Sequence, residues 1–339
     1  MFFEQPIFFE KNRVFRVYTG GKLLGNLMGD DCTDGFFPEE WIASSVKAIN
    51  LESRDENEGI SKIKGEDIYF DKALNEHKKE MLGEKDNLGI LVKYLDSAIR
   101  LPVQAHPDKA FSRKHFNSSY GKEECWYVLD TRPGACIYFG FDKGVTKEQF
   151  EDAVKKSETD KDAMEKLLKK YEVKKGDFVF IPAKAVHAIG AGCLILEIQE
   201  PTDFTIQPER WCGDYKLSDK EMYIGLEPET AMECFDFEEG KNPFMTPENK
   251  TTKDGVSITK LIDENTTESF SLTRVNIKGG KTLLSEGAAV YIVTEGAGKI
   301  KGNDYEKEVK KGDYFFLPYG ARDKFFIESS DIEFLYALS

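Results

Sequence analysis

The sequence predicts a mainly β protein built from two small antiparallel β-barrels with one helical insertion. The chain has 339 residues, more than one ordinary hydrophobic core needs. The block EVKKGDFVFIP at 172–182 recurs at 308–318 as EVKKGDYFFLP, with eight identities in eleven positions. Short runs of β-branched and aromatic residues lie near both blocks. The repeat therefore indicates two copies of one β unit.

Strands of the first copy are predicted where short apolar runs meet turn residues. The runs 125–129 and 135–139 flank Thr131-Arg-Pro-Gly134, a turn sequence that favours a hairpin. Further strands are predicted at 101–106, 177–181 and 193–198.

The helical insertion is predicted at about 145–172. Thr146 and Gln149 have capping-box spacing, and apolar residues then recur at helical intervals among many Lys and Glu. A second helical stretch is predicted near 218–234. We expect a first domain at 1–245 that contains both stretches, and a second, β-rich domain at 246–339.

Composition limits the partners of the chain. The formal charge of −14 disfavours nucleic acid and anionic membranes, because phosphate groups attract basic faces. The N-terminus lacks the pattern of a signal peptide, and no apolar run is long enough to span a bilayer. The six cysteines form no CxxC pair, which indicates reduced thiols. We expect a cytoplasmic protein, monomer or homodimer, with a small-molecule ligand.

Four side chains are candidate metal ligands. Gln104 and His106 are two residues apart, so on a strand they point to the same face. Glu124 precedes an aromatic strand, where a carboxylate is unusual without a function, and His187 follows the Gly-Asp-x4-Pro turn. A single buried histidine is more often a satisfied core residue than a ligand, but the set of four indicates a metal site.

The repeat supplies an internal control for this prediction. Glu124 aligns with Ala289 and His187 aligns with Asp323, so the second copy keeps the scaffold residues without the candidate ligands. The metal site is therefore predicted in the first copy alone. His77 and His115 lie among charged residues and are interpreted as solvated surface side chains.

Three stretches carry a family resemblance. Residues 93–108, 121–130 and 181–190 resemble the diagnostic stretches of type I mannose-6-phosphate isomerases, and 176–187 resembles the second cupin motif. The resemblance implies a bicupin, with two cupin-like barrels. It also implies one zinc ion per chain, held by Gln104, His106, Glu124 and His187. The implied reaction interconverts mannose 6-phosphate and fructose 6-phosphate by proton transfer between C1 and C2.

Two lysines and a serine are candidates for contact with the sugar phosphate. Lys122 shares a strand face with Glu124, which suits it to proton transfer or charge stabilisation, although an exposed lysine at the strand entry is the alternative. By the resemblance, Lys93 is the candidate for phosphate, with Ser45 as a weaker neutral donor.

One departure from the family pattern affects the predicted activity. Where the family has a Ser-Asp-x-Thr-Tyr-Arg stretch, with an arginine implicated in isomerisation, this chain has Gln207. Arg210 is our candidate to reach the same space. Two alternatives stay open: a sugar-phosphate-binding protein with weak or no turnover, and a metal-dependent cupin enzyme acting on another sugar, with iron as an alternative metal.

Overall fold

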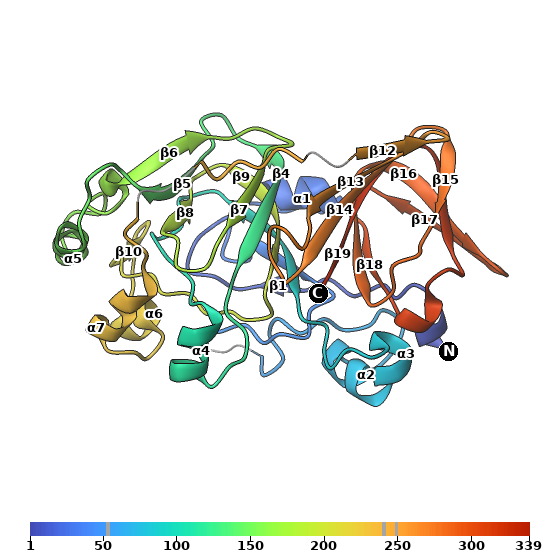
Figure 1. The fold of residues 1–339 in the computed structure, drawn as a ribbon, viewed down its shortest axis with the longest axis horizontal. Helices are drawn as coiled ribbons and strands as arrows, with labels where there is room; N and C mark the ends of the chain where they lie inside the picture. Colours follow the sequence, from blue (N-terminus) through green and yellow to red (C-terminus); the bar gives the residue numbers. More distant parts are fainter. Residues whose placement is uncertain (52–54, 239–241, 248–249) are drawn as a thin grey trace.

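The computed structural model describes residues 1–51, 55–238, 242–247 and 250–339. Its elements form two β-rich units side by side (Figure 1). The strands are β1 Arg13–Val14, β2 Glu39–Ile42, β3 Leu91–Ser97, β4 Glu124–Thr131, β5 Cys136–Phe141, β6 Leu168–Glu172, β7 Phe178–Ile181, β8 His187–Ile189, β9 Cys193–Gln199, β10 Trp211–Cys212, β11 Tyr215–Lys216, β12 Lys250–Lys253, β13 Val256–Ile262, β14 Ser271–Ile277, β15 Gly280–Leu283, β16 Ala289–Gly302, β17 Tyr305–Lys310, β18 Tyr314–Leu317 and β19 Phe326–Leu338. The α-helices are α1 Lys22–Met28, α2 Phe70–Glu76, α3 Lys78–Leu82, α4 Lys109–Phe116, α5 Lys147–Lys156, α6 Asp219–Tyr223 and α7 Pro228–Ala231, and the short 3-10 helices are η1 Phe2–Glu4, η2 Glu165–Leu167, η3 Met232–Cys234 and η4 Tyr319–Ala321.

Antiparallel sheets build both units, which confirms the mainly β prediction. The first unit has a six-stranded sheet, β1-β2-β3-β9-β4-β7, and a three-stranded sheet, β6-β5-β8. The second unit is an eight-stranded sheet along β12-β13-β14-β19-β16-β17, with β15 on β19 and β18 on β16. Among the described residues none of these sheets closes into a barrel, so the two closed barrels of the prediction are not seen.

The sequence repeat has a structural counterpart in strand register. In the first unit β7 pairs with β4, and Glu124 lies opposite Ile181. In the second unit β18 pairs with β16, and Ala289 lies opposite Leu317. The two repeated blocks therefore occupy equivalent places, which confirms the alignment of Glu124 with Ala289.

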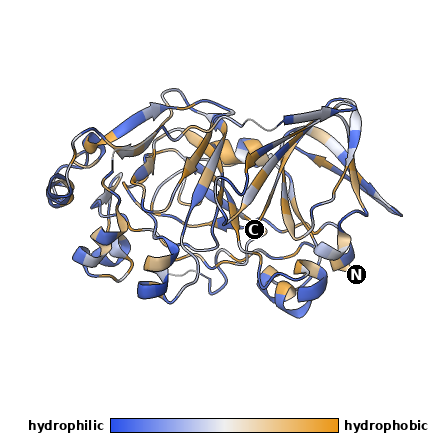
Figure 2. Cartoon of the chain, in the orientation of Figure 1, coloured by the Kyte–Doolittle hydropathy of each residue, from blue (hydrophilic) through white to orange (hydrophobic). Residues whose placement is uncertain are grey.

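Strand alternation separates the two faces of the six-stranded sheet. One face packs against the three-stranded sheet, with Trp126 and Ile195 in contact with Ile137 and its neighbours. The other face shares a core with the second unit, which includes Tyr127 and Phe316. Figure 2 shows hydrophobic residues along the strands of both units and a mostly hydrophilic α5.

The predicted helical segments form, but the insertion is shorter than expected. The capping boxes at Thr146 and Ser218 are both present and begin α5 and α6. Residues 168–172, predicted as helix, instead form strand β6, which pairs with β5. The segment pairs with β5 through its backbone and buries Leu168 in the core, so tertiary pairing overrides helical spacing there. Residues 101–106, predicted as a strand, make only isolated bridges at 104 and 105.

Candidate metal centre and adjoining cavity

Three predicted ligands converge between the two sheets of the first unit. Ligand atoms of His106, Glu124 and His187 all lie within 4.8 Å of one another. His106 Nε2 is 3.1 Å from Glu124 Oε2, and His187 Nε2 is 3.4 Å from Glu124 Oε1. Gln104, the fourth predicted ligand, has its Nε2 atom 3.3 Å from His187 Nε2. All four are buried, and at most 7% of any of them is exposed.

Local backbone hydrogen bonds bring Gln104, His106 and His187 together. Gln104 and His187 exchange backbone hydrogen bonds of 2.9 Å in each direction. Between β7 and β8 the chain turns at Lys184, which adopts a left-handed φ of 68°. The backbone N–H of Lys184 donates to the His106 carbonyl at 2.7 Å, so the turn that precedes one histidine is fixed to the other.

The outer hydrogen bonds of the two histidines direct the Nε2 lone pair of each ring into the cluster. His106 Nδ1 lies 3.0 Å from the Phe204 carbonyl, and His187 Nδ1 lies 2.9 Å from the Ala185 carbonyl. Because a carbonyl only accepts, each Nδ1 carries the hydrogen and each Nε2 presents a lone pair. Such outer hydrogen bonds are typical of metal-binding histidines.

The donor set fits a divalent cation. Both Glu124 carboxylate oxygens are buried, and the imidazole lone pairs of His106 and His187 face them, with the Lys122 ammonium 3.2 Å from Oε2. Burial and the neighbouring Lys122 ammonium lower the pKa of His106 to about 3, and burial lowers the pKa of His187. Two neutral imidazoles, a carboxylate and an amide are ligands that zinc and similar ions accept. No comparable cluster occurs in the described residues of 250–339.

Lys122 lies in direct contact with this cluster. Its Nζ atom is 3.0 Å from His106 Nε2 and 3.2 Å from Glu124 Oε2, and the residue is 3% exposed. The alternative of an exposed lysine at the strand entry is therefore wrong.

A cavity of about 670 Å³ adjoins the cluster. Gln104 and Lys122 line it together with polar residues from β2, β3, β9, α6 and several loops. The charged residues of the lining are Arg16, Glu39, Lys93, Lys122, Glu197, Asp203, Lys220 and Glu221. A space of this size with converging polar groups is typical of a small-molecule site.

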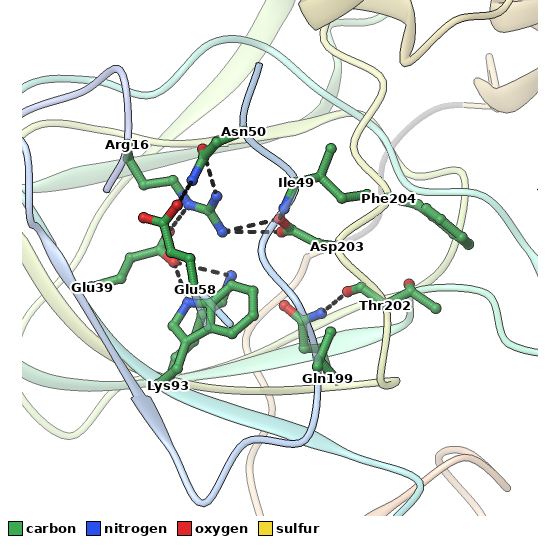
Figure 3. A network of polar contacts seen from close by, with 12 residues as sticks. Arg16, Glu39, Ile49, Asn50, Glu58, Lys93, Gln199, Thr202, Asp203 and Phe204 are labelled. Atoms are coloured by element: carbon green, nitrogen blue, oxygen red, sulfur yellow. Dashed lines mark hydrogen bonds and ion pairs between the residues drawn. The ribbon is translucent and has the colours of Figure 1, made fainter. Parts of the chain in front are cut away.

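A buried ion-pair network forms one wall of the cavity (Figure 3). Lys93 Nζ lies 3.0 Å from Glu197 Oε1 and 3.9 Å from Glu39 Oε2. Arg16 lies 3.2 Å from Glu39 and 3.1 Å from Asp203. Lys93 and Glu197 are direct cross-strand partners on β3 and β9, so the sheet itself fixes their contact.

Glu197 differs from the other carboxylates of this network. Burial and the negative charge of Glu124 raise its pKa to about 7, against the opposing effect of Lys93 and Lys122. By contrast, Arg16 and Lys93 overcome the effect of burial and hold the pKa of Glu39 at about 2. Glu197 therefore has the carboxyl pKa suited to exchange of a proton near neutral pH.

Three other predicted residues lie in different surroundings. Gln207 lines the cavity, and its amide donates to the Glu221 carbonyl at 3.2 Å. Arg210 lies outside the lining and forms ion pairs of 2.8 Å with Glu158 and Asp219. Ser45 is half-buried and also lies outside the lining.

Sequence reasoning missed part of this wall. Glu197 lies within the apolar run of β9, and Glu39 begins β2 as Glu124 begins β4, so a carboxylate in or next to a buried strand was a usable signal. Arg16 gave no signal, because its bonds to Asp203 join residues 187 positions apart.

The fold and the site define a β-sheet protein with a buried His–Glu–His cluster, able to hold a metal, beside a polar cavity. No protein-family model matches the chain. It is 33% identical to mannose-6-phosphate isomerase ManA of Bacillus subtilis over 255 residues, which are 73% of this chain and 75% of that protein. It is 27% identical to the mannose-6-phosphate isomerase of Streptococcus mutans over 320 residues, 93% and 92% of the two chains.

Solved structures agree with this assignment at the level of the fold. The mannose 6-phosphate isomerase of Bacillus subtilis superposes with a TM-score of 0.78 at 23% identity, over 98% of this chain and 99% of that one. A mutant phosphomannose isomerase of Salmonella typhimurium gives 0.71 at 14% identity, over 99% and 100%. The chain belongs to the mannose-6-phosphate isomerase family. None of the described helices is both long and apolar enough to cross a membrane.

Proposed function

We propose that the chain is a zinc-dependent isomerase that interconverts mannose 6-phosphate and fructose 6-phosphate. The convergence of Gln104, His106, Glu124 and His187 at the end of a cavity carries the proposal. Relatives named mannose-6-phosphate isomerase support the choice of substrate.

The four converging residues would hold one zinc ion per chain. When bound, such an ion polarises the carbonyl and hydroxyl oxygens of a sugar and makes the adjacent carbon–hydrogen bond more acidic. The buried carboxylate of Glu124 supplies the negative charge that offsets the cation.

Proton transfer between C1 and C2 requires a base that can both take and return a proton. We assign this role to the Glu197 carboxylate, which lines the cavity and has a pKa near the pH of the cell interior. Lys122 would stabilise negative charge on the sugar oxygens with its ammonium group.

Substrate binding is assigned to residues of the cavity and its surroundings. Lys93 stays our candidate for the sugar phosphate, as an ammonium in the cavity wall. Ser45 and Arg210 stay predictions as a neutral donor and a catalytic group, each of which would have to approach the cavity from outside its present lining.

The wider organisation is also proposed from these features. The paired β7–β4 and β18–β16 registers support a bicupin, with a catalytic domain at 1–245 and a domain without metal ligands at 246–339. The six free cysteines and the charge of −14 support a cytoplasmic monomer or homodimer that binds a small sugar phosphate.

A coupled assay tests the proposal. Zinc-loaded protein should convert mannose 6-phosphate to fructose 6-phosphate, and His187→Ala should lose that activity. His77→Ala is the matched control, because His77 packs against Phe2 and Phe3 and takes no part in the cluster. Absence of turnover in fully zinc-loaded wild-type protein would contradict the proposal.

Gln207 favours a second candidate function. A neutral amide in the cavity, at the position where the family pattern has an arginine, suits a protein that binds the sugar phosphate without converting it. Calorimetric binding of mannose 6-phosphate without turnover would identify this function.

A further inference from the structure

The cavity contains an arginine that comes from the N-terminal segment. Arg16 follows β1 and lines the cavity, and its guanidinium carbon lies 5.2 Å from the centre of the Trp41 ring. Among the described residues that line the cavity, Arg16 is the only arginine. Arg210 lies outside the lining, and position 207 is a glutamine.

The network holds the guanidinium in one orientation. Its Nε lies 3.2 Å from Glu39, and Nη2 donates to both Asp203 oxygens at 3.1 Å. Asn50 accepts one hydrogen bond from Nη1 at 3.3 Å (Figure 3). Because Nη1 carries two hydrogens, one donor remains for a ligand in the cavity.

Asp203, which pairs with Arg16, lies on a loop that also contacts the predicted metal ligands. Asp203 lies on the loop after β9, which continues through Phe204 and Ile206. The Phe204 carbonyl accepts the hydrogen bond from His106 Nδ1, and Ile206 pairs with Ala105, between two predicted metal ligands. The loop that orients Arg16 therefore also supports the metal centre.

We propose that Arg16 is a catalytic residue whose guanidinium stabilises the sugar oxygens that become negative during isomerisation. This inference rests on the proposed isomerase function. Glu39 and Asp203 hold the guanidinium in one orientation, and a fixed donor suits charge that develops only in the transition state. The proton still moves between C1 and C2, and Arg16 itself exchanges none.

The first test compares Arg16→Gln with Arg13→Gln. Arg13 belongs to the same segment and pairs with Asp30 at 2.8 Å and buried Glu40 at 3.1 Å, but lies outside the cavity lining. Arg16→Gln should lower kcat about 10²-fold with little change in KM, which is the effect of removing one oxyanion donor. Arg13→Gln loses a comparable ion pair and should keep kcat within about threefold.

A relocated guanidinium separates catalysis from structural support. Gln207 lines the same cavity, so the double variant Arg16→Gln/Gln207→Arg places an arginine there from a different segment. It should recover at least about tenfold in kcat over Arg16→Gln. Gln207→Arg alone is the control: a catalytic role for Arg16 predicts a larger gain in kcat in the Arg16→Gln background than in the wild type, whereas a purely structural role predicts the same gain in both.

The outcomes distinguish the inference from the function on which it rests. An inactive zinc-loaded wild type refutes the isomerase function and the inference with it. An active wild type with Arg16→Gln unchanged in kcat, or altered in KM alone, overturns only the role of Arg16. Thermal unfolding of each variant checks folding. If Arg16→Gln does not fold, Arg16→Lys replaces it, and kcat unchanged in that folded variant also overturns the role.

Discussion

Tyr314→Phe should destabilise the protein by disturbing a buried carboxylate between the two β units. Glu40 on β2 is fully buried and accepts hydrogen bonds from the Tyr314 hydroxyl at 2.5 Å and from the Asn12 backbone at 2.8 Å. Arg13 Nε forms an ion pair with Glu40 Oε2 at 3.1 Å. Tyr314 lies on β18, so its hydroxyl joins the second unit to the sheet that carries the cavity wall.

The magnitude follows from the charge and burial of Glu40. Loss of one hydrogen bond to a buried charged acceptor costs about 2 kcal/mol. In a chain of this length that corresponds to a fall in Tm of about 4 °C. Burial raises the pKa of Glu40, and the Tyr314 hydrogen bond opposes that rise. The variant should therefore raise this pKa further, and the loss of stability should be larger at pH 8 than at pH 5, where Glu40 more readily takes a proton.

Thermal and urea unfolding followed by circular dichroism measure this effect. Tyr305→Phe is the control, because Tyr305 is half-buried on β17 and its hydroxyl donates to none of the residues that the structure describes. Equal stability of the two variants at pH 8 would refute the reasoning.

Three further predictions concern the cavity wall. The pKa of Glu39 near 2 lies below its ordinary value of 4.5, so Glu39 stabilises the protein by about 3 kcal/mol above pH 4.5 and loses this as the pH falls toward 2. Acid unfolding should show this dependence, and Glu39→Gln should reduce it. Glu197→Gln should lower kcat by about 10²- to 10⁴-fold, which is the usual contribution of a general base. Calorimetry should still detect binding of mannose 6-phosphate to this variant. An unchanged kcat would mean that another residue is the base. Lys93→Met removes a cation 3.0 Å from Glu197 and should move the acidic limb of the kcat profile to higher pH; an unmoved limb contradicts the role of Glu197.

Local sequence signals predicted three side chains that the structure brings together, His106, Glu124 and His187. His187 follows the Gly-Asp-x4-Pro block, which forms β7 and leads into the turn at Lys184, and Glu124 begins an apolar strand, so each has a recognisable local setting. The repeat then predicted which unit holds the cluster, and the strand registers of β4 and β16 agree with it.

Long-range contacts account for what the sequence did not predict. Arg16 reaches Asp203 across 187 positions, and nothing near either residue signals the pairing. Residues 168–172 have helical spacing, yet β5 offers them an edge to pair with, and they become a strand. Closure of each unit into a barrel depends on pairing between distant strands, for which the repeat carries no information.

A zinc titration of chelator-stripped protein tests the metal centre and the reaction together. Conversion of mannose 6-phosphate should rise linearly with added zinc and stop rising at one zinc per chain, while Glu124→Gln should stay inactive and bind zinc weakly. Full activity in stripped protein, or none after one bound equivalent, would contradict a zinc-dependent isomerase built on Gln104, His106, Glu124 and His187.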